Sequence, residues 1–279
     1  MSNLNEDTKL LKWDQIGEKE YETGTDRGVV YPFNTSTNQY DTGYAWSGLT
    51  GVTESPEGGD ATDLWADNIK YLTMRSTEKL NFTIEAYAYP EEFATLDGTA
   101  EIATGVRIGQ QNRGVFGFAY RTILGNDTEL DNHGYKLHIL YGASASPSEK
   151  GYQTVNDSPE AITFSWECTT TPVNVTGNFK PTASVTIDST KVDPEKLAAL
   201  EEILYGTAGV ATYTEFSGQS FDSGTDYYTR SGSEGAYVYT KTSDVTPQSG
   251  VTYYTKSVSA DTAARLPLPD EIARIFAAG

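Results

Sequence analysis

The sequence predicts a mainly β protein with a few added helices. Its 279 residues include 19 Tyr and 10 Phe, residue types that are enriched in sheets. Gly, Asn, Asp and Pro recur between short apolar stretches, which is typical of turns between strands. The alternation of apolar and polar residues is clearest in residues 162–168 (ITFSWEC), and it predicts a strand with one buried face.

Strand character recurs along the chain, and three helices are predicted beside the strands. The candidate strands are residues 29–33, 44–53, 69–72, 80–89, 114–124, 135–141, 162–170 and 183–187. The clearest helix follows Asp193, which can cap its N-terminus, and Pro194, which suits its first turn. Apolar residues then recur at helical spacing up to a terminating glycine, at Leu197, Leu200, Leu204 and Gly206. Shorter helices should follow Pro90 and Pro269.

An internal repeat lies after the predicted helix. Residues 213–231 and 239–257 match at many positions, and every matched pair is offset by 26 residues. A period of this size usually marks a duplicated supersecondary unit. The Ser-Gly before each Tyr-Tyr pair predicts a hairpin turn that enters an aromatic strand. Residues 207–262 are therefore expected to form a small β appendage between a domain over 1–206 and a C-terminal arm over 263–279.

Charge and composition exclude several classes of protein. The chain has 39 acidic and 20 basic residues and a formal net charge of −19, which argues against binding nucleic acid by neutralising phosphates. Its single cysteine, Cys168, excludes an internal disulfide. Glu6 and Asp7 stand where a signal peptide needs apolar residues, and no apolar run reaches the roughly 18 residues of a membrane helix. We expect a soluble protein without a membrane anchor, made in the cytoplasm.

Residue types that carry catalysis or bind metals form no group with suitable spacing. His133 and His138 are five residues apart and should face opposite sides, so a shared metal site is not expected. Cys168 lies on the apolar side of its strand, which favours a core residue over a nucleophile. Asp157 and Glu160 could be glycosidase carboxylates, but a solvated surface is the favoured interpretation. We therefore expect no catalytic residue, no cofactor and no metal.

A series of sequence blocks spans most of the chain outside residues 207–262. In order, they are residues 19–32 (KEYETGTDRGVVYP), 45–72 (AWSGLTGVTESPEGGDATDLWADNIKYL), 84–98 (IEAYAYPEEFATLDG), 105–127, 133–173, 189–206 and 265–276 (RLPLPDEIARIF). Taken together in this order, the blocks resemble the major tail protein of long-tailed bacteriophages. The resemblance implies a tail tube subunit with a β-sandwich or split β-barrel and a flanking α-helix. Such subunits assemble as hexameric rings that stack into a hollow tube.

The resemblance also implies partners and a location. The partners would be copies of the same chain, other tail proteins at the tube ends, and phage DNA that passes through the lumen without specific binding. The protein would be made in the host bacterial cytoplasm and end in the virion tail. The Tyr-rich repeats depart from the family pattern, so no role carries over to them. Exposed tyrosines there could stack on host-surface glycans, although packing between the two repeats is favoured.

Residues 54–63 form a small, acidic stretch between two predicted strands. In the resembled family a long loop at this place reaches into neighbouring subunits, which implies an inter-subunit loop here. Its residues are Glu54, Ser55, Pro56, Glu57, Gly58, Gly59, Asp60 and Asp63. The glycine pair should keep the loop mobile until a partner orders it. A surface loop without any role remains the alternative.

Two other functions stay open at this point. One is a carbohydrate-binding module or glycosidase of a secreted protein, suggested by the Tyr-rich repeats and the acid pairs. The charged N-terminus, which does not read as a signal peptide, weighs against it. The other is a different phage tail or capsid-decorating protein built on the same β scaffold.

Overall fold

The computed structural model describes residues 11–152, 154 and 161–277. Contacts divide the chain into two compact units: Met1–Tyr205 together with Ala264–Gly279, and Gly206–Ala263. We call the first the main unit and the second the repeat unit. Their bounds lie within one residue of those expected from the sequence. The fold is mainly β, as predicted, with antiparallel sheets and short helices.

The main unit is built from strands β1 to β13 and three helices. The strands are β1 (Tyr21–Asn34), β2 (Gln39–Tyr40), β3 (Tyr44–Trp46), β4 (Leu49–Glu57), β5 (Ala61–Ala66), β6 (Ile69–Arg75), β7 (Lys79–Ala86), β8 (Ala100–Ala103), β9 (Val106–Ile108), β10 (Phe116–Asn126), β11 (Leu130–Ala145), β12 (Phe164–Thr170) and β13 (Ser184–Asp188). The helices are α1 (Glu91–Leu96), α2 (Pro194–Tyr205) and α3 (Pro269–Ala277). The stretch 44–53, predicted as one strand, is divided between β3 and β4 at Gly48, whose φ is 83°.

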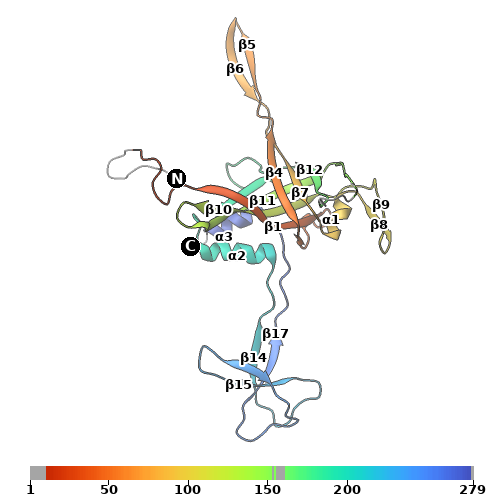
Figure 1. The fold of residues 1–279 in the computed structure, drawn as a ribbon, viewed down its shortest axis with the longest axis vertical. Helices are drawn as coiled ribbons and strands as arrows, with labels where there is room; N and C mark the ends of the chain where they lie inside the picture. Colours follow the sequence, from red (N-terminus) through yellow and green to blue (C-terminus); the bar gives the residue numbers. More distant parts are fainter. Residues whose placement is uncertain (1–10, 153, 155–160, 278–279) are drawn as a thin grey trace. The chain divides into compact units, whose positions relative to one another are not determined.

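The main sheet has the order β2-β1-β10-β11-β12-β7-β4 and antiparallel ladders (Figure 1). Besides β10, strand β11 pairs with two further strands, which form two branches of the sheet. Its residues 136–140 pair with β13, and its residues 143–145 pair with β12. Gly142 lies between the branches with a φ of 59°, and a Cβ there would come within 2.2 Å of the Thr171 carbonyl oxygen. A glycine is therefore needed where the strand changes partner.

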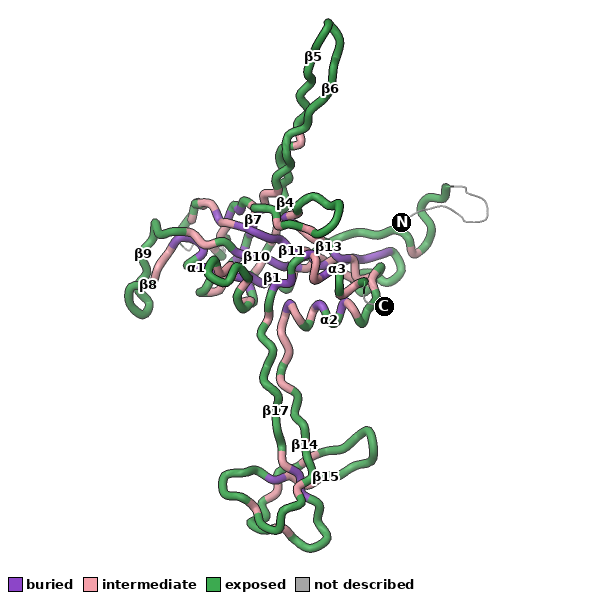
Figure 2. The backbone as a smooth tube through the Cα atoms, turned by 180° about the vertical axis from the view of Figure 1, so that it is seen from behind, coloured by how far each residue is buried: buried purple, intermediate pink, exposed green. Residues whose placement is uncertain are grey.

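Each face of the main sheet carries its own core. One core is aromatic and packs against α1, whose Phe93 ring lies 4.5 Å from the Trp46 ring. The other packs against α2 and α3. Side chains alternate between the two, since Val30 belongs to the first core and its neighbours Val29 and Tyr31 belong to the second. Figure 2 shows these buried residues concentrated in the main sheet and its helices.

Helix α2 begins and ends where the sequence predicts. The Glu195 backbone N–H donates to Oδ1 of Asp193 at 2.8 Å, which caps the N-terminus. The buried face consists of Leu197, Leu200 and Leu204. The Tyr31 hydroxyl donates to the Leu204 carbonyl oxygen at 2.7 Å and ties the end of the helix to β1. Helices α1 and α3 also lie where the sequence predicts them, after Pro90 and from Pro269.

The repeat unit is a four-stranded sheet of β14 (Ala211–Phe216), β15 (Tyr227–Ser231), β16 (Val238–Lys241) and β17 (Tyr253–Val258), in the order β14-β17-β15-β16. The predicted hairpin within each repeat is wrong. Strand β14 pairs with β17 and β15 pairs with β16, so each repeat pairs with the other repeat. Gly224 and Gly250 do have positive φ, but the turns they form lead to a partner in the other repeat.

Candidate functional site

The predicted inter-subunit loop belongs to a two-part β-hairpin over residues 54–82, which we call the arm. Its inner part is the pairing of β4 with β7, and its outer part is the pairing of β5 with β6. Glu54, Ser55, Pro56 and Glu57 continue β4 and pair with β7, from Glu54 opposite Phe82 to Glu57 opposite Lys79. Asp63 belongs to β5. The expectation of a loop over the whole of residues 54–63 is therefore wrong, since only Gly58, Gly59 and Asp60 lie outside the strands there.

Pairing between β4 and β7 explains why residues 54–57, which have low strand propensity, are extended. Backbone groups of β7 bond those of β4 whatever side chains β4 carries, so pairing overrides propensity. Pro56 is tolerated because β4 pairs with β7 alone among the described strands, and an edge strand can hold a residue that lacks an N–H.

The pair Gly58 and Gly59 connects the β4–β7 ladder to the β5–β6 ladder. Gly58 and Gly59 have φ values of 86° and 73°. A Cβ on Gly58 would come within 2.5 Å of the Thr77 carbonyl oxygen, so the close approach of the two chains requires glycine. The Ser76 N–H donates to the Asp60 carbonyl oxygen at 3.0 Å and starts the second ladder.

The outer part of the arm, β5 and β6, closes on a two-residue turn. Asp67 and Asn68 have φ values of 50° and 64°, as type I′ hairpin turns require, and Ala66 pairs with Ile69 across them. This Asp-Asn turn was the sequence signal that could have revealed the hairpin. Figure 2 shows the whole β5–β6 segment as exposed.

The hairpin is amphipathic. Thr62 pairs with Met74, Leu64 with Leu72 and Ala66 with Ile69, so these side chains share one face. The larger apolar members are strongly exposed: Leu64 41%, Ile69 64%, Leu72 40% and Met74 55%. We call these four residues the apolar face.

The opposite face of the hairpin is mixed: it carries Asp63 and Thr73, and also Trp65, which pairs with Lys70 and is 69% exposed. Asp63 accepts a bond from the Lys70 ammonium at 2.7 Å and another from the Thr73 hydroxyl at 2.7 Å. These bonds, that from Lys70 above all, lower the pKa of Asp63. The polar side chains of this face thus have partners within the hairpin, whereas Trp65 and the four residues of the apolar face are open to water.

A polar cluster fixes the base of the arm to the main sheet. The Tyr120 hydroxyl donates to Glu54 at 2.7 Å, and the Tyr120 ring stacks on the His138 ring at 4.6 Å. The His138 ring nitrogens lie 3.5 Å from Glu22 and 4.0 Å from Glu54. Burial lowers the pKa of His138 and raises that of Tyr120. Sequence reasoning could not find this cluster, because its members are far apart in the chain.

No family model matches the chain, and no curated protein matches it.

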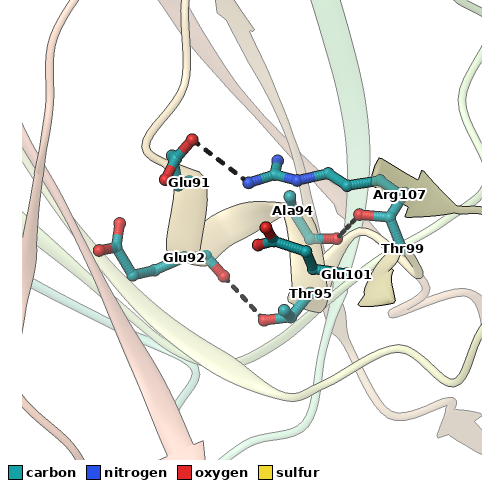
Figure 3. Close-up of a pocket in the computed structure, with 7 residues that line it drawn as sticks. All are labelled: Glu91, Glu92, Ala94, Thr95, Thr99, Glu101 and Arg107. Atoms are coloured by element: carbon teal, nitrogen blue, oxygen red, sulfur yellow. Dashed lines mark hydrogen bonds and ion pairs between the residues drawn. The ribbon is translucent and has the colours of Figure 1, made fainter. Parts of the chain in front are cut away.

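A second feature is a shallow recess beside α1 (Figure 3). Glu91, Glu92, Glu101 and Arg107 line it, and Arg107 lies 3.4 Å from the Glu91 carboxylate, which is 88% exposed. Dashed lines in Figure 3 mark this ion pair and two hydrogen bonds of threonine hydroxyls to helix carbonyl oxygens. These are the contacts of a solvated helix end.

The other residues considered for chemistry have structural surroundings or lie outside the described parts. Cys168 is 1% exposed, and burial raises the pKa of its thiol, so the predicted core role is confirmed. Asp157 and Glu160 lie outside the described residues. Within residues 11–152, 154 and 161–277, no three potential metal ligands come together. The helices in these ranges are too short or too polar to cross a membrane.

Tyrosines of the repeat unit mostly pack within it. Tyr227, Tyr253 and Tyr254 are buried, and the Tyr213 ring stacks on the Tyr239 ring at 3.9 Å. Packing between the repeats, the role favoured from the sequence, thus accounts for these rings.

Proposed function

We propose that this protein is a structural subunit that polymerises with copies of itself, and that its assembly is the tail tube of a long-tailed bacteriophage. In this proposal the chain has no catalytic role. Stacked hexameric rings of the main unit enclose a channel through which DNA leaves the virion. The sequence resemblance supplies the identity of the assembly, and the arm supplies its physical basis.

The open apolar face of the arm is the observation that carries the proposal. An isolated two-stranded hairpin is at best marginally stable in water. Here the hairpin also holds four apolar side chains that are 40% to 64% exposed. Covering each of them would contribute about 1 kcal/mol, at about 25 cal/mol per Å² of apolar surface. Such a hairpin is suited to a partner that covers its exposed apolar side chains.

A second copy of the same chain is the partner that the main unit favours. Further apolar residues are exposed elsewhere on this unit, at Leu11, Trp13 and Ile16 before β1 and at Ile102, Val106 and Ile108 on the β8–β9 hairpin. Strand β4 also has a free edge within the described parts. Exposed edges and apolar patches are hazards in a monomer, and contacts in a closed ring remove both.

The charge of the chain suits a conduit for DNA. A subunit that neutralised phosphates with Lys and Arg would hold the genome in place by releasing counterions. With a net charge of −19, each copy instead contributes repulsion toward a polyanion. DNA would therefore pass through such a tube without specific binding.

Self-association without any ligand tests this proposal. The purified protein is concentrated, and its size is followed by sedimentation velocity while its shape is followed by negative-stain electron microscopy. The proposal expects rings or tubes about as wide as a phage tail. Binding to a glycan array by a protein that stays monomeric would favour the carbohydrate-binding alternative instead.

A further inference from the structure

Every ladder between the described strands of the repeat unit joins one repeat to the other. Strands β14 and β15 come from the first repeat, and β16 and β17 come from the second. The ladders are β14–β17, β15–β16 and β15–β17. A repeat therefore contributes two strands that are separated from each other in the sheet by a strand of its partner.

The two repeats are related by a local twofold axis. In the central ladder Tyr228 stands opposite Tyr254, its own equivalent 26 residues later. On either side of this pair the register is symmetric, because Tyr227 faces Thr255 and Thr229 faces Tyr253. The axis thus passes between Tyr228 and Tyr254.

Ring geometry follows the same symmetry. The Tyr213 and Tyr228 rings of the first repeat lie 5.3 Å apart at 78°, and the equivalent Tyr239 and Tyr254 rings lie 5.2 Å apart at 80°. The Tyr213 and Tyr239 rings stack on each other at 3.9 Å and 3°, although they come from the two outer strands. Equivalent side chains thus meet across the axis.

Hydrogen bonds of the turns repeat at the same offset. The Asp222 N–H donates to the Tyr227 hydroxyl at 2.9 Å, and the Gln248 N–H donates to the Tyr253 hydroxyl at 3.2 Å. Both the turn and the strand that follows it are therefore copied in the two repeats. The copies differ at Phe216 and Phe221, whose equivalents are Thr242 and Pro247. Both phenylalanines that pack on Tyr227 therefore come from the first repeat, and Phe221 also contacts Tyr253.

We infer that one repeat is a self-complementary association module, which closes a four-stranded sheet with any second copy of itself. A lone repeat would leave its strand edges unpaired and its tyrosine rings in water. In the natural chain the second copy follows after a connector of residues 232–237, and this short link favours closure within one chain. Where a chain carries one repeat, the partner must be the repeat of another chain, as in domain swapping.

This inference does not depend on the proposed function, and deletion of one period tests it. Removing residues 218–243 fuses the start of the first repeat to the end of the second, and removing residues 232–257 leaves the first repeat alone. Each deletion spans 26 residues, one full period of the repeat, so both keep the register of the β14–β17 ladder. Two variants are needed because the natural unit contains one Phe221 ring. A dimer of the first variant would contain none, and a dimer of the second would contain two.

A cysteine placed next to the twofold axis shows by disulfide formation whether the repeats of two chains pair. Tyr254→Cys is introduced with the first deletion and Tyr228→Cys with the second. In a symmetric dimer the introduced thiols face each other, at the roughly 4.5–5.5 Å Cα separation of directly opposed antiparallel residues, which a disulfide can bridge. The full chain with Tyr254→Cys is the matched control, because Tyr228 stands opposite that position. Cys168 is buried and should not contribute.

Apart from the stated deletions, every protein in the experiment keeps the rest of the chain. Each also carries Leu64→Ser and Leu72→Ser, so that contacts of the arm do not obscure the result. After mild oxidation, at least one single-repeat variant should run at doubled mass on a non-reducing gel, while the control stays at single mass. The inference is overturned if both single-repeat variants remain at single mass. It is also overturned if the control cross-links as readily as they do, since pairing would then not need a free repeat.

Discussion

Leu64 stands directly opposite Leu72 on the β5–β6 ladder, and 41% and 40% of these residues, respectively, are exposed to water. A pair of leucines on a surface hairpin would ordinarily be a liability. On the other face of the same hairpin, Lys70 and Thr73 satisfy Asp63. The exposed leucine pair is what the self-assembly proposal explains, and it gives the first prediction.

Replacing both leucines, Leu64→Ser with Leu72→Ser, should weaken self-association without unfolding the main unit. The two side chains together should contribute about 2 kcal/mol to each hairpin contact, which corresponds to about 30-fold in its association constant. Sedimentation velocity over a concentration series measures the change. The matched control is Asp63→Asn with Lys70→Gln on the opposite face, which should associate like the parent.

Removing the outer hairpin should abolish assembly altogether. Deleting residues 61–75 joins Asp60 to Ser76, whose N–H already bonds the Asp60 carbonyl oxygen at 3.0 Å, and it leaves the β4–β7 ladder intact. Because the deleted residues are exposed, the free energy of unfolding should change by less than about 1 kcal/mol. Urea unfolding and electron microscopy check the two expectations. If the shortened protein polymerises as well as the parent, the arm is only a surface feature.

Removing the repeat unit should have the opposite outcome. The backbone N–H groups of Thr207 and Thr262 donate to each other's carbonyl oxygens at 3.0 and 2.9 Å, so the two ends of the repeat unit are already held together. A chain without residues 210–260 should therefore keep the main unit folded, and we expect it to assemble like the parent. Circular dichroism and negative-stain imaging give the readout. Loss of assembly in a folded variant would place the repeats within the tube contacts.

Acid should destabilise the main unit through His138. Burial lowers the pKa of this imidazole below its ordinary value of 6.5, against the opposing effect of the Glu54 and Glu22 carboxylates and together with Lys136. The folded state thus binds fewer protons than the unfolded state. The stability contributed by neutral His138 is present above pH 6.5 and is lost as the pH falls below it.

The variant His138→Gln separates this effect from other titrations. Glutamine can still bond the Thr122 hydroxyl, which lies 3.0 Å from the His138 ring. Urea unfolding at pH 7.5, 6.5 and 5.5 should show a shallower loss of stability in the variant. Titration of Glu22 should not contribute to the loss of stability between pH 7.5 and 5.5. Burial raises its pKa, but bonds from Lys136 and Thr122 outweigh burial and lower it below its ordinary 4.5. Equal slopes for parent and variant would contradict the assignment.

Local signals in the sequence predict the elements that local interactions decide. Helix α2 needs a cap, a proline and spaced leucines, and all of these lie within residues 193–206. Burial of Cys168 likewise follows from the alternation within its own strand.

Elements decided by a distant partner were missed. Glu54 to Glu57 have poor strand propensity and are extended because β7 pairs with them. The two Ser-Gly turns of the repeats were recognised, but a turn residue does not specify which strand comes to lie beside the next one, and each repeat pairs with its copy. The cluster of Glu22, Glu54, Tyr120 and His138 exists only once the four strands β1, β4, β10 and β11 meet.

The central claim is that this chain polymerises by itself through its main unit. Negative-stain electron microscopy of the purified, concentrated full-length protein tests it most directly, with the variant lacking residues 61–75 beside it under identical conditions. The account predicts ring-shaped particles, and tubes of stacked rings, for the parent and neither for the variant. A parent protein that stays monomeric and featureless at every concentration and salt condition tried would contradict the claim.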